Sequence, residues 1–350
     1  MVGLSGGVDS SVAAILLKQQ GYKVIGAHMI VHQLQQEATQ KAKEITKSLQ
    51  IPFYQFNLIE EFRNTVGCYI QSEYLNGRTP NPCAICNKEI KFGKFLQAIE
   101  NEIGHFDFFA TGHYAKKIVL PNGRLSVQKG EDKNKDQAYF LSRLSQTQLK
   151  KIIFPLYQLK KDEVRSIAAQ HNLAVATSKE SQDLCIGSYL DQIQGSSGEG
   201  DFIQESTARI VGRHKGIEHY TIGQKRGLYI TVGYPLYVTK IDVKNNIVYV
   251  DKEDKLYSTE MKINNINWIG VENPPLPWNG EIKIRYRDEG TMATLCELVV
   301  DDKSNNSSAT VLFKSPTRAI TPGQLAVAYD NEGNLAFSGF IESTFNKTIE

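Results

Sequence analysis

Glycine and serine residues near the start of the chain form a pattern that suits phosphate binding. An apolar run, Met1 to Leu4, leads into a Ser/Gly-rich turn, and an amphipathic helix follows at once. Glycines let backbone N–H groups approach an anion closely, and a helix N-terminus adds a positive dipole. Ser5, Ser10 and Ser11 offer hydroxyl donors. Because the Gly-Lys-Ser/Thr ending of the Walker loop is missing, the pattern predicts a phosphate loop of another kind.

Three of the five cysteines stand where a thiol could react. Cys83 and Cys86 belong to a loop, Asn76–Lys88, that two prolines and a glycine are expected to order. We expect Cys86 at or just before the start of the next helix, where the helix N-terminus lowers the pKa of a thiol. Cys185 stands alone near the middle of the chain. Two reactive cysteines brought into one site can exchange sulfur through a persulfide and a disulfide.

A metal site is the alternative for the same thiols. Cys83-x-x-Cys86 could be half of a zinc or iron–sulfur site. No second Cys-x-x-Cys or Cys-x-x-His follows, so a four-thiolate zinc site is not expected. An iron–sulfur cluster held by Cys83, Cys86 and Cys185 is the less favoured interpretation. Cys68 and Cys296 lie in apolar segments and are expected to be small side chains of the core.

Alternating strand-like and helix-like segments must position these residues. In chain order they are a strand at Lys23–His28, a helix at Glu37–Leu49, a strand at Phe53–Asn57, helices at Glu60–Leu75 and Lys88–Ile103, and a strand at Phe106–Ala110. This alternation predicts an α/β fold with a doubly wound parallel sheet. Ligands then bind at the carboxyl ends of the strands, where the loops Ser5–Ser11 and Thr111–His113 emerge.

The sequence changes character beyond Cys185. Gly195–Gly200 is expected to be a flexible linker. Short strand-like segments separated by turn signals follow at Tyr234–Val243, Asn246–Val250, Gly280–Tyr286, Thr291–Val300, Ala309–Phe313 and Leu325–Asp330. We therefore expect three domains: an α/β domain at 1–200, a small central domain at 201–260 and a C-terminal β-barrel at 261–350.

Composition narrows the class of protein. The 350 residues are 41% hydrophobic and 22% charged, as in ordinary globular proteins, and no apolar run approaches a membrane span. Neither a signal peptide nor a disulfide framework is indicated, so we expect a cytoplasmic protein. A net charge of +2 permits nucleic-acid binding without requiring it. Basic and aromatic residues interleave in Arg213–Lys240, which favours phosphate contact and base stacking, with a solvated face as the alternative.

Six segments occur in an order that resembles one enzyme family. They are SGGVDSS, NGRTPNPxxxCNKEIKF, ATGHYAK, KDQAYFL, SQDLCIG and HYTIGQKRGL. The first resembles the pyrophosphate loop of ATP pyrophosphatases, and the whole set resembles bacterial tRNA-specific 2-thiouridylases over essentially the entire chain. The resemblance implies an adenine nucleotide α-hydrolase-like domain, a central domain and a C-terminal β-barrel.

The resemblance also implies roles for positions of this chain. ATP would be bound by Gly3, Leu4, Ser5, Gly6, Gly7, Val8, Asp9, Ser10, Met29 and Gly112. Cys86 would be the nucleophile, and Cys185 would carry the persulfide. The tRNA would be bound by Asn81, Pro82, Cys83, His113, Lys135, Asp136, Gln137, Arg285, Tyr286 and Gln324. Within this set, the run Asn81–Cys83 would meet the target base.

The chain departs from the family pattern at three places. Many members have Asp where Cys83 stands, so a carboxylate is not available at that position. The acidic, aromatic insertion that often follows the second strand is missing, since His28–His32 runs almost directly into a Gln-rich helix start. The first strand is also short.

The reaction of the family fits these residues. O2 of the tRNA wobble uridine, position 34, is a poor leaving group, so ATP first adenylates it and pyrophosphate leaves. The phosphate loop and Mg²⁺ would stabilise the negative charge that develops on the phosphates. Persulfide sulfur on Cys185 then attacks C2, and Cys86 either attacks the sulfur bridge or frees a sulfide that attacks directly. The wobble base must be splayed into the pocket. A sulfur-carrier protein or a cysteine desulfurase is the implied sulfur source.

Two other functions compete with this one. An amidating ligase or a lysidine-type tRNA synthetase would explain the phosphate loop but gives Cys86 and Cys185 no task. A non-catalytic tRNA-binding or iron–sulfur carrier protein would not need the intact loop. ATP-dependent release of pyrophosphate in the presence of tRNA would decide between an enzyme and a carrier.

Overall fold

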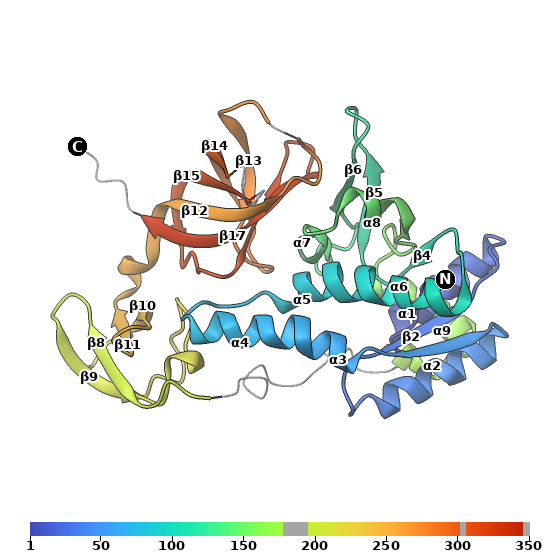
Figure 1. The fold of residues 1–350 in the computed structure, drawn as a ribbon, viewed down its shortest axis with the longest axis horizontal. Helices are drawn as coiled ribbons and strands as arrows, with labels where there is room; N and C mark the ends of the chain where they lie inside the picture. Colours follow the sequence, from blue (N-terminus) through green and yellow to red (C-terminus); the bar gives the residue numbers. More distant parts are fainter. Residues whose placement is uncertain (178–194, 273, 302–305, 346–350) are drawn as a thin grey trace.

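The computed structural model describes residues 1–177, 195–272, 274–301 and 306–345. They form three parts (Figure 1): a parallel sheet flanked by helices, a small sheet after residue 195, and a closed C-terminal barrel. The predicted fold class is confirmed. None of the helices in these residues is both long and apolar enough to cross a bilayer.

The first part is built on a five-stranded parallel sheet. In spatial order its strands are β3 (Phe53–Asn57), β2 (Gly26–Ile30), β1 (Val2–Gly3), β4 (Phe109–Ala110) and β7 (Ile152–Ile153). β1 pairs with both β2 and β4, so the first strand of the chain lies at the centre of the sheet. The strand order reverses at β1, and such a reversal opens a ligand crevice at the carboxyl ends of the central strands.

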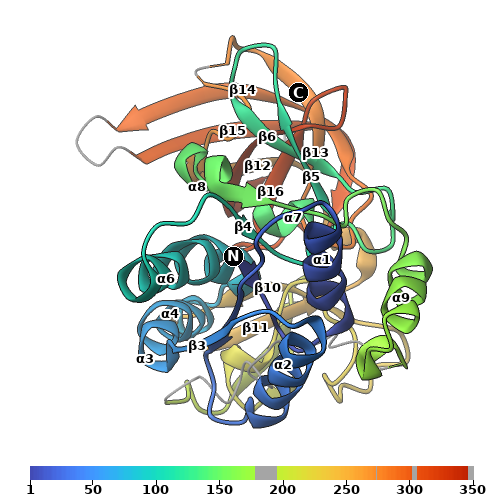
Figure 2. The ribbon, with the colours of Figure 1, turned by 90° about the vertical axis from the view of Figure 1, so that its right-hand side faces the viewer.

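Helices cover both faces of this sheet (Figure 2). On one face α1 (Val8–Gln19), α2 (Gln36–Leu49) and α9 (Lys161–Gln170) share an apolar cluster with β1. The other face carries two long helical stretches, each with a π-helical segment in its middle. They consist of α3 (Ile59–Phe62), η1 (Arg63–Gly67) and α4 (Cys68–Leu75), and of α5 (Pro82–Ile85), η2 (Cys86–Lys94) and α6 (Phe95–Ile103).

Asn81 and Pro82 set the start of the second helical stretch. The side chain of Asn81 accepts a hydrogen bond from the backbone N–H of Ala84 at 3.3 Å, and Pro82 occupies the first helical position, where no N–H is needed. Cys86 therefore lies in the second turn, and the prediction that it stands at or just before the helix start is wrong. The prolines indicated a loop, whereas one of them begins a helix.

Cys68 is exposed on α4, so its prediction as a core side chain is also wrong. Val66 and Ile70, four residues apart, are buried on one face of the helix. Cys68 lies midway between them and therefore points to the opposite side. Cys296 is partly exposed, and its Sγ lies 3.6 Å from the carbonyl oxygen of Thr294.

Short elements connect the parallel sheet to the rest of the chain. They are the hairpin β5 (Ala115–Val119) and β6 (Leu125–Lys129), the helices α7 (Ala138–Leu141) and α8 (Gln146–Lys151), and the 3-10 turn η3 (Ala174–Thr177). α8 begins with a capping box formed by Ser145 and Gln148.

Two antiparallel or mixed β-structures follow residue 195. The small sheet has the order β10 (Tyr237–Asp242), β11 (Ile247–Asp251), β8 (Gly200–Gln204) and β9 (Arg209–His214), with η5 (Ile217–His219) beside it. After η6 (Glu253–Leu256), the barrel closes in the order β12 (Tyr257–Asn267), β15 (Asn306–Arg318), β14 (Thr291–Asp301), β13 (Trp278–Lys283), β16 (Leu325–Tyr329) and β17 (Leu335–Phe345).

The segment Gly195–Gly200, predicted to be a flexible linker, is fixed on the small sheet. The hydroxyls of Ser196 and Ser197 each donate to the carboxylate of the buried Glu218 at 2.7 Å. The side-chain amide of Asn246 donates to carbonyl oxygens of the same segment at 3.0–3.4 Å. The prediction is wrong because serines that suit a linker here satisfy a buried carboxylate.

Acid is expected to release this segment. Burial raises the pKa of Glu218, but the hydroxyls of Ser196 and Ser197 outweigh that effect and hold the pKa below its ordinary 4.5. A carboxyl whose folded-state pKa is depressed stabilises the fold above its unfolded pKa and loses that contribution as pH falls through the folded pKa. At pH values below 4.5, we expect the hydrogen-exchange protection factors of residues 195–200 to decrease. In Glu218→Gln they should be low at neutral pH already, and constant protection in the wild type would contradict the argument.

A buried arginine joins the barrel to the first part. The guanidinium of Arg143 donates to O and Oδ1 of Asn265 at 2.6 and 3.0 Å and to the carbonyl oxygen of Ser338 at 3.2 Å. It also lies 4.9 Å from the ring centroid of Phe340. Burial lowers the pKa of Arg143 to about 10, so the group stays charged at neutral pH.

Replacing Arg143 by alanine is expected to destabilise the protein by about 3 kcal/mol, because three acceptors, among them the carbonyl of the fully buried Ser338, would lose a charged donor. Denaturant unfolding measures the change. Lys150→Ala, on the exposed surface of α8, serves as the control. An Arg143→Ala protein within about 0.5 kcal/mol of the wild type would show that this contact does not hold the barrel in place.

Candidate functional site

The loop after β1 folds its hydroxyls back onto its own backbone. The N–H of Ser5 donates to Oγ of Ser10 at 3.1 Å, the N–H of Gly7 donates to Oγ of Ser5 at 3.3 Å, and Oγ of Ser10 donates to the carbonyl of Gly7 at 3.1 Å. Gly6 has a φ of +80°, and a Cβ there would lie 2.5 Å from the carbonyl oxygen of Ala38. α1 begins directly afterwards without a side-chain cap, which suits its N-terminus to an anion.

Gly112 brings the loop after β4 against the first loop. A Cβ on Gly112 would lie 2.7 Å from the carbonyl carbon of Asp9 and from the backbone nitrogen of Ser10. Only glycine fits this approach. Gly112, after β4, and the loop Ser5–Ser10, after β1, are predicted from the sequence to bind one nucleotide, and the structure brings them together.

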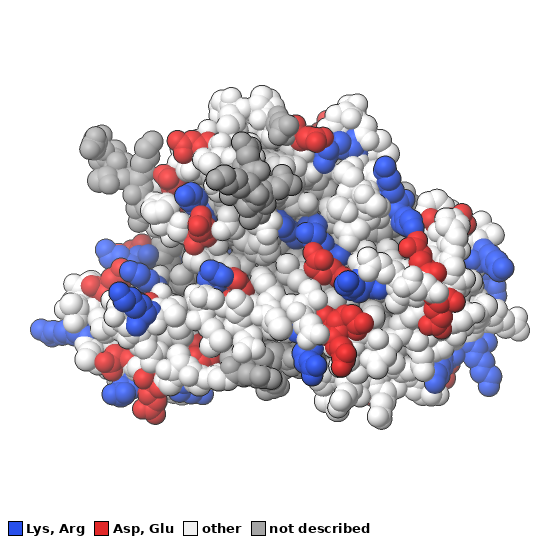
Figure 3. All heavy atoms as spheres, viewed as in Figure 1, with Lys and Arg blue, Asp and Glu red and all other residues white. Residues whose placement is uncertain are grey.

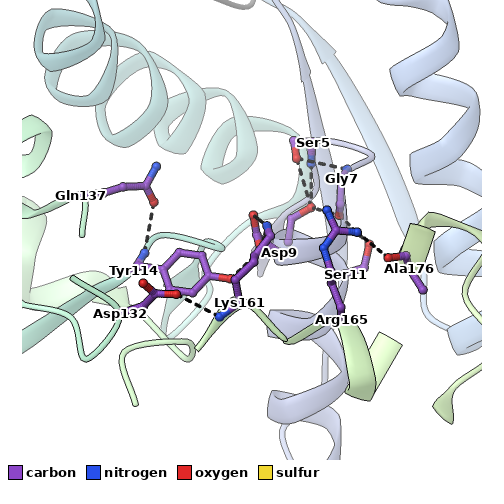
Figure 4. A network of polar contacts seen from close by, with 11 residues as sticks. Ser5, Gly7, Asp9, Ser11, Tyr114, Asp132, Gln137, Lys161, Arg165 and Ala176 are labelled. Carbon is purple, nitrogen blue, oxygen red and sulfur yellow. Dashed lines mark hydrogen bonds and ion pairs between the residues drawn. The ribbon is translucent and has the colours of Figure 1, made fainter. Parts of the chain in front are cut away.

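Asp9 is the centre of a charged network (Figure 4). Its oxygens accept from Nζ of Lys161 at 2.7 and 2.8 Å, and Oδ1 also accepts from the hydroxyl of Tyr114 at 2.7 Å. Lys161 is 9% exposed and is the first residue of α9. Neither partner was predicted from the sequence as a site residue. A lysine at a helix start opposes the helix dipole, and that unfavourable placement is the signal that could have identified Lys161.

Two hydrogen-bonded links run from this network to the segment 132–137. Tyr114 and Gln137 exchange two bonds: the N–H of Tyr114 donates to Oε1 of Gln137 at 3.1 Å, and the N–H of Gln137 donates to the carbonyl of Tyr114 at 2.9 Å. The N–H of Lys161 donates to Oδ2 of Asp132 at 3.0 Å. The predicted tRNA-contact run 135–137 is therefore adjacent to the predicted ATP loop.

Met29 lies on β2 and packs against the apolar cluster of α4 and α6. Its neighbour His28 is hydrogen-bonded to the start of the phosphate loop, because its Nδ1 donates to the carbonyl oxygen of Leu4 at 2.7 Å. Burial lowers the pKa of His28, so the ring is neutral at physiological pH. The structure thus places Met29 beside the loop strand, while its contact with adenine stays a prediction.

The described thiols of the predicted site lie on one helical stretch. Cys83 is in the first turn and Cys86 in the second, and both are partly exposed. Cys86 packs against the apolar cluster of α4 and α6. Asn87, which follows it, donates from its side-chain amide to the carbonyl of Phe140 at 3.1 Å. Cys185 lies outside the described residues, so the pairing of Cys86 with Cys185 stays a prediction.

Gln324 of the barrel holds the loop that leads into this helix. Its side-chain amide donates to the carbonyl oxygens of Thr79 and Pro80 at 3.2 and 2.8 Å. The N–H of Thr79 donates in return to the carbonyl of Pro322 at 2.9 Å. Next to it, the N–H of Asn81 donates to the hydroxyl of Tyr69 at 3.0 Å. Gln324 and Asn81–Cys83, predicted separately as tRNA contacts, therefore lie close together, although Asn81 and Pro82 are buried.

The second predicted tRNA-contact group also combines two domains. The ring of Tyr286, from the barrel, packs against Phe140 with centroids 4.5 Å apart and ring planes tilted by 34°. Arg285 donates from its guanidinium to the carbonyl of Arg318 at 2.7 Å. Asp136 is 8% exposed and accepts from backbone N–H groups at 3.1 and 3.3 Å, and burial raises its pKa. Its carboxylate therefore orders the segment from inside.

His113 has its side chain in the core rather than at the surface. Its Nδ1 lies 2.7 Å from Oγ1 of Thr111, and its ring packs against Phe92 and Phe154. Burial lowers the pKa of His113 well below 6.5. A direct contact between this ring and tRNA stays a prediction, which the described burial does not favour.

The basic and aromatic stretch Arg213–Lys240 is only partly available to RNA. His214 and Tyr220 are buried and pack with Phe202, so neither can stack on a base. Tyr229, by contrast, is 95% exposed. Among the described residues visible in Figure 3, Lys and Arg are interspersed with Asp and Glu rather than gathered in a broad basic patch.

No group of three or more His, Cys, Asp or Glu side chains within the described ranges is arranged to hold a metal ion. This statement does not cover Cys185, which an iron–sulfur cluster on Cys83 and Cys86 would need.

Comparisons with known proteins give one consistent family. Family models described as tRNA methyl transferase HUP domain, tRNA methyl transferase PRC-barrel domain and Aminomethyltransferase beta-barrel domain match residues 1–188, 187–252 and 258–338. The tRNA-specific 2-thiouridylase MnmA of Chlorobium luteolum is 41% identical, covering 98% of this chain and 95% of its own. The protein of the same name from Nostoc punctiforme is 40% identical, covering 98% of each chain.

Two solved structures resemble part of the chain. NMN synthetase from Francisella tularensis is 17% identical with a TM-score of 0.33, over 55% of this chain and 77% of its own. The U34-tRNA thiolase NcsA from Methanococcus maripaludis, with its [4Fe-4S] cluster, is 22% identical with a TM-score of 0.34, over 54% of this chain and 62% of its own. Neither likeness bears on the chemistry of the site.

Proposed function

Because the chain belongs to the tRNA-specific 2-thiouridylase family, we propose that it is a tRNA-uridine 2-sulfurtransferase that converts the wobble uridine, position 34, to 2-thiouridine. The observation that supports this most directly is the phosphate loop with Asp9 held by Lys161 and Tyr114. The proposed partners are the anticodon region of tRNA and a sulfur-carrier protein or cysteine desulfurase.

The loop suits the triphosphate of ATP. Glycines at positions 6 and 112 leave no room for a Cβ, and the hydroxyls of Ser5 and Ser10 lie within the same turn as the start of α1. Bound ATP would supply the AMP group that makes O2 of the uridine a leaving group. The carboxylate of Asp9 would hold Mg²⁺, which would stabilise the charge on the phosphates, since Mg²⁺ in phosphate sites takes one or two protein carboxylates. Lys161 would offset the charge of the departing pyrophosphate.

The sulfur step uses two thiols. The terminal persulfide sulfur on Cys185 attacks C2, the C2–O2 bond breaks, and AMP leaves. The thiolate of Cys86 then attacks Sγ of Cys185, and the S–S bond breaks with its electron pair on the sulfur of 2-thiouridine. A Cys86–Cys185 disulfide remains, which an external thiol must reduce by two electrons. In the alternative route, Cys86 attacks Sγ of Cys185 first, and the hydrosulfide released attacks C2.

The three domains take separate tasks in this proposal. Residues 1–200 carry the ATP and sulfur chemistry, while the central domain at 201–260 and the barrel at 261–350 bind tRNA. The contacts of Gln324 with the loop before Asn81, and of Tyr286 with Phe140, support tRNA binding across the junction of barrel and first domain. Cys83 would face the target base, although the chain has a thiol there instead of the commoner carboxylate.

The test is mass analysis of tRNA nucleosides after incubation with ATP, Mg²⁺ and a persulfide donor. We expect 2-thiouridine together with AMP and pyrophosphate. Formation of ADP and phosphate, or of a nucleoside other than 2-thiouridine, would contradict the proposal. Iron analysis of the same sample addresses the cluster alternative: full thiolation by iron-free protein supports the two-cysteine route, and a strict need for iron would contradict it.

A further inference from the structure

Tyr114 connects the phosphate loop to the segment 132–137. It is 3% exposed, its hydroxyl donates to Oδ1 of Asp9 at 2.7 Å, and its backbone exchanges two hydrogen bonds with Gln137 at 3.1 and 2.9 Å (Figure 4). We propose that Tyr114 is a positioning residue that couples tRNA binding at 132–137 to the placement of the Asp9 carboxylate. The inference rests on the proposed function, which puts tRNA at one end of this link and ATP at the other.

A second link makes the connection tighter. Oδ2 of Asp132 accepts from the N–H of Lys161, whose ammonium holds both oxygens of Asp9, and Oδ1 of Asp132 accepts from the N–H of Asn134 at 3.1 Å. Asp132 thus fixes the start of α9 and the turn of the segment together. A shift of the segment would move the partners of Asp9 from two directions.

Coupling between the two binding sites needs an element with two states, and we assign this role to the side chain of Gln137, which can bond either to Tyr114 or to RNA. Its Oε1 accepts from the amide of Tyr114 in the described structure. Carboxamide side chains also hydrogen-bond the edges and backbone of nucleotides. When the side chain of Gln137 turns toward RNA, the buried backbone N–H of Tyr114 loses its acceptor and must find another. The ring of Tyr114 then moves together with its backbone, and so does the hydroxyl that bonds to Asp9.

Coupling of this kind is reciprocal: if tRNA tightens nucleotide binding by a factor, the nucleotide tightens tRNA binding by the same factor. We expect a factor of about 10 in the wild type. Tyr114→Phe keeps the ring and both backbone bonds with Gln137 but removes the hydroxyl on Asp9. The factor should then fall below about 2, while each ligand alone binds within about two-fold of the wild type. A purely structural role would lower the thermal midpoint without moving the factor.

The experiment measures the Kd of α,β-methylene-ATP with and without unmodified substrate tRNA, and the Kd of the tRNA with and without the analogue. Tyr157→Phe is the matched control, because Tyr157 is a tyrosine of the neighbouring segment whose carbonyl bonds to Glu131. An unchanged factor in Tyr114→Phe, or no coupling in the wild type, would overturn the inference. Failure of the wild type to bind either ligand would instead overturn the proposed function.

A second variant keeps the test open if Tyr114→Phe is unstable. Gln137→Met removes the oxygen that accepts from the amide of Tyr114 but leaves the backbone bond from residue 137 in place. Its tRNA affinity alone should fall, its affinity for the analogue alone should not, and the coupling factor should again fall below about 2. A factor equal to that of the wild type would overturn the inference.

Discussion

Cys86→Ser and Cys185→Ser are each expected to lower tRNA thiolation by roughly 10³-fold or more, while tRNA-dependent release of pyrophosphate in the first turnover stays within a few-fold of the wild type, because adenylation of O2 precedes the sulfur step. Serine matches cysteine in size, but its hydroxyl neither carries a persulfide nor ionises at neutral pH. Cys86 lies in the second turn of its helical stretch, packed against the apolar cluster, so the substitution should leave the fold unchanged. Single-turnover assays that follow pyrophosphate and 2-thiouridine separately provide the measurement.

Cys68→Ser is the matched control for these variants. Cys68 is exposed on α4, on the face opposite to Val66 and Ile70, so its replacement should change neither product. Substantial thiolation by the Cys185→Ser protein would remove the persulfide role from that residue. Loss of pyrophosphate release in Cys86→Ser would show instead that Cys86 serves the ATP step.

The parallel sheet could be predicted because β2, β3 and the helices between strands have clear periodicity, and strand–helix alternation has one common three-dimensional solution. Other strands were beyond prediction for physical reasons. β7 has two residues, too few for any period. The barrel strands β12 and β17 are interrupted by shifts of register, for example between Lys262 and Ile263, and such bulges break the alternation of apolar and polar residues.

Within the site, the sequence identified the contiguous motifs but not their long-range partners. The residues that bond to Asp9 are 105 and 152 positions away, and no local pattern links them. Sequence also does not say which way a side chain points. His113 and Asp136 were expected to contact tRNA because of their place in a motif, yet both are buried and hydrogen-bonded inside the fold. Motif membership identifies a segment, and packing decides which of its atoms remain available.

Asp9→Asn is expected to slow tRNA-dependent release of pyrophosphate by roughly 10²–10³-fold, the usual cost of losing a charged group that positions or neutralises a transferring phosphate. Asparagine keeps the shape and the acceptor for Tyr114, but it leaves the ammonium of Lys161 without its counter-ion. Because Lys161 is 9% exposed, we also expect a loss of about 2 kcal/mol in the free energy of unfolding.

The double variant Asp9→Asn with Lys161→Met separates the two effects. Methionine removes the unpaired charge, so stability should recover while pyrophosphate release stays low, because neither partner can then act on the phosphates. Lys160→Met, a change at the exposed neighbour of Lys161, should leave both quantities near wild type. Recovery of activity along with stability would mean that Asp9 and Lys161 form a structural ion pair, and the ATP chemistry would have to depend on the hydroxyls of Ser5 and Ser10 and the backbone of the loop.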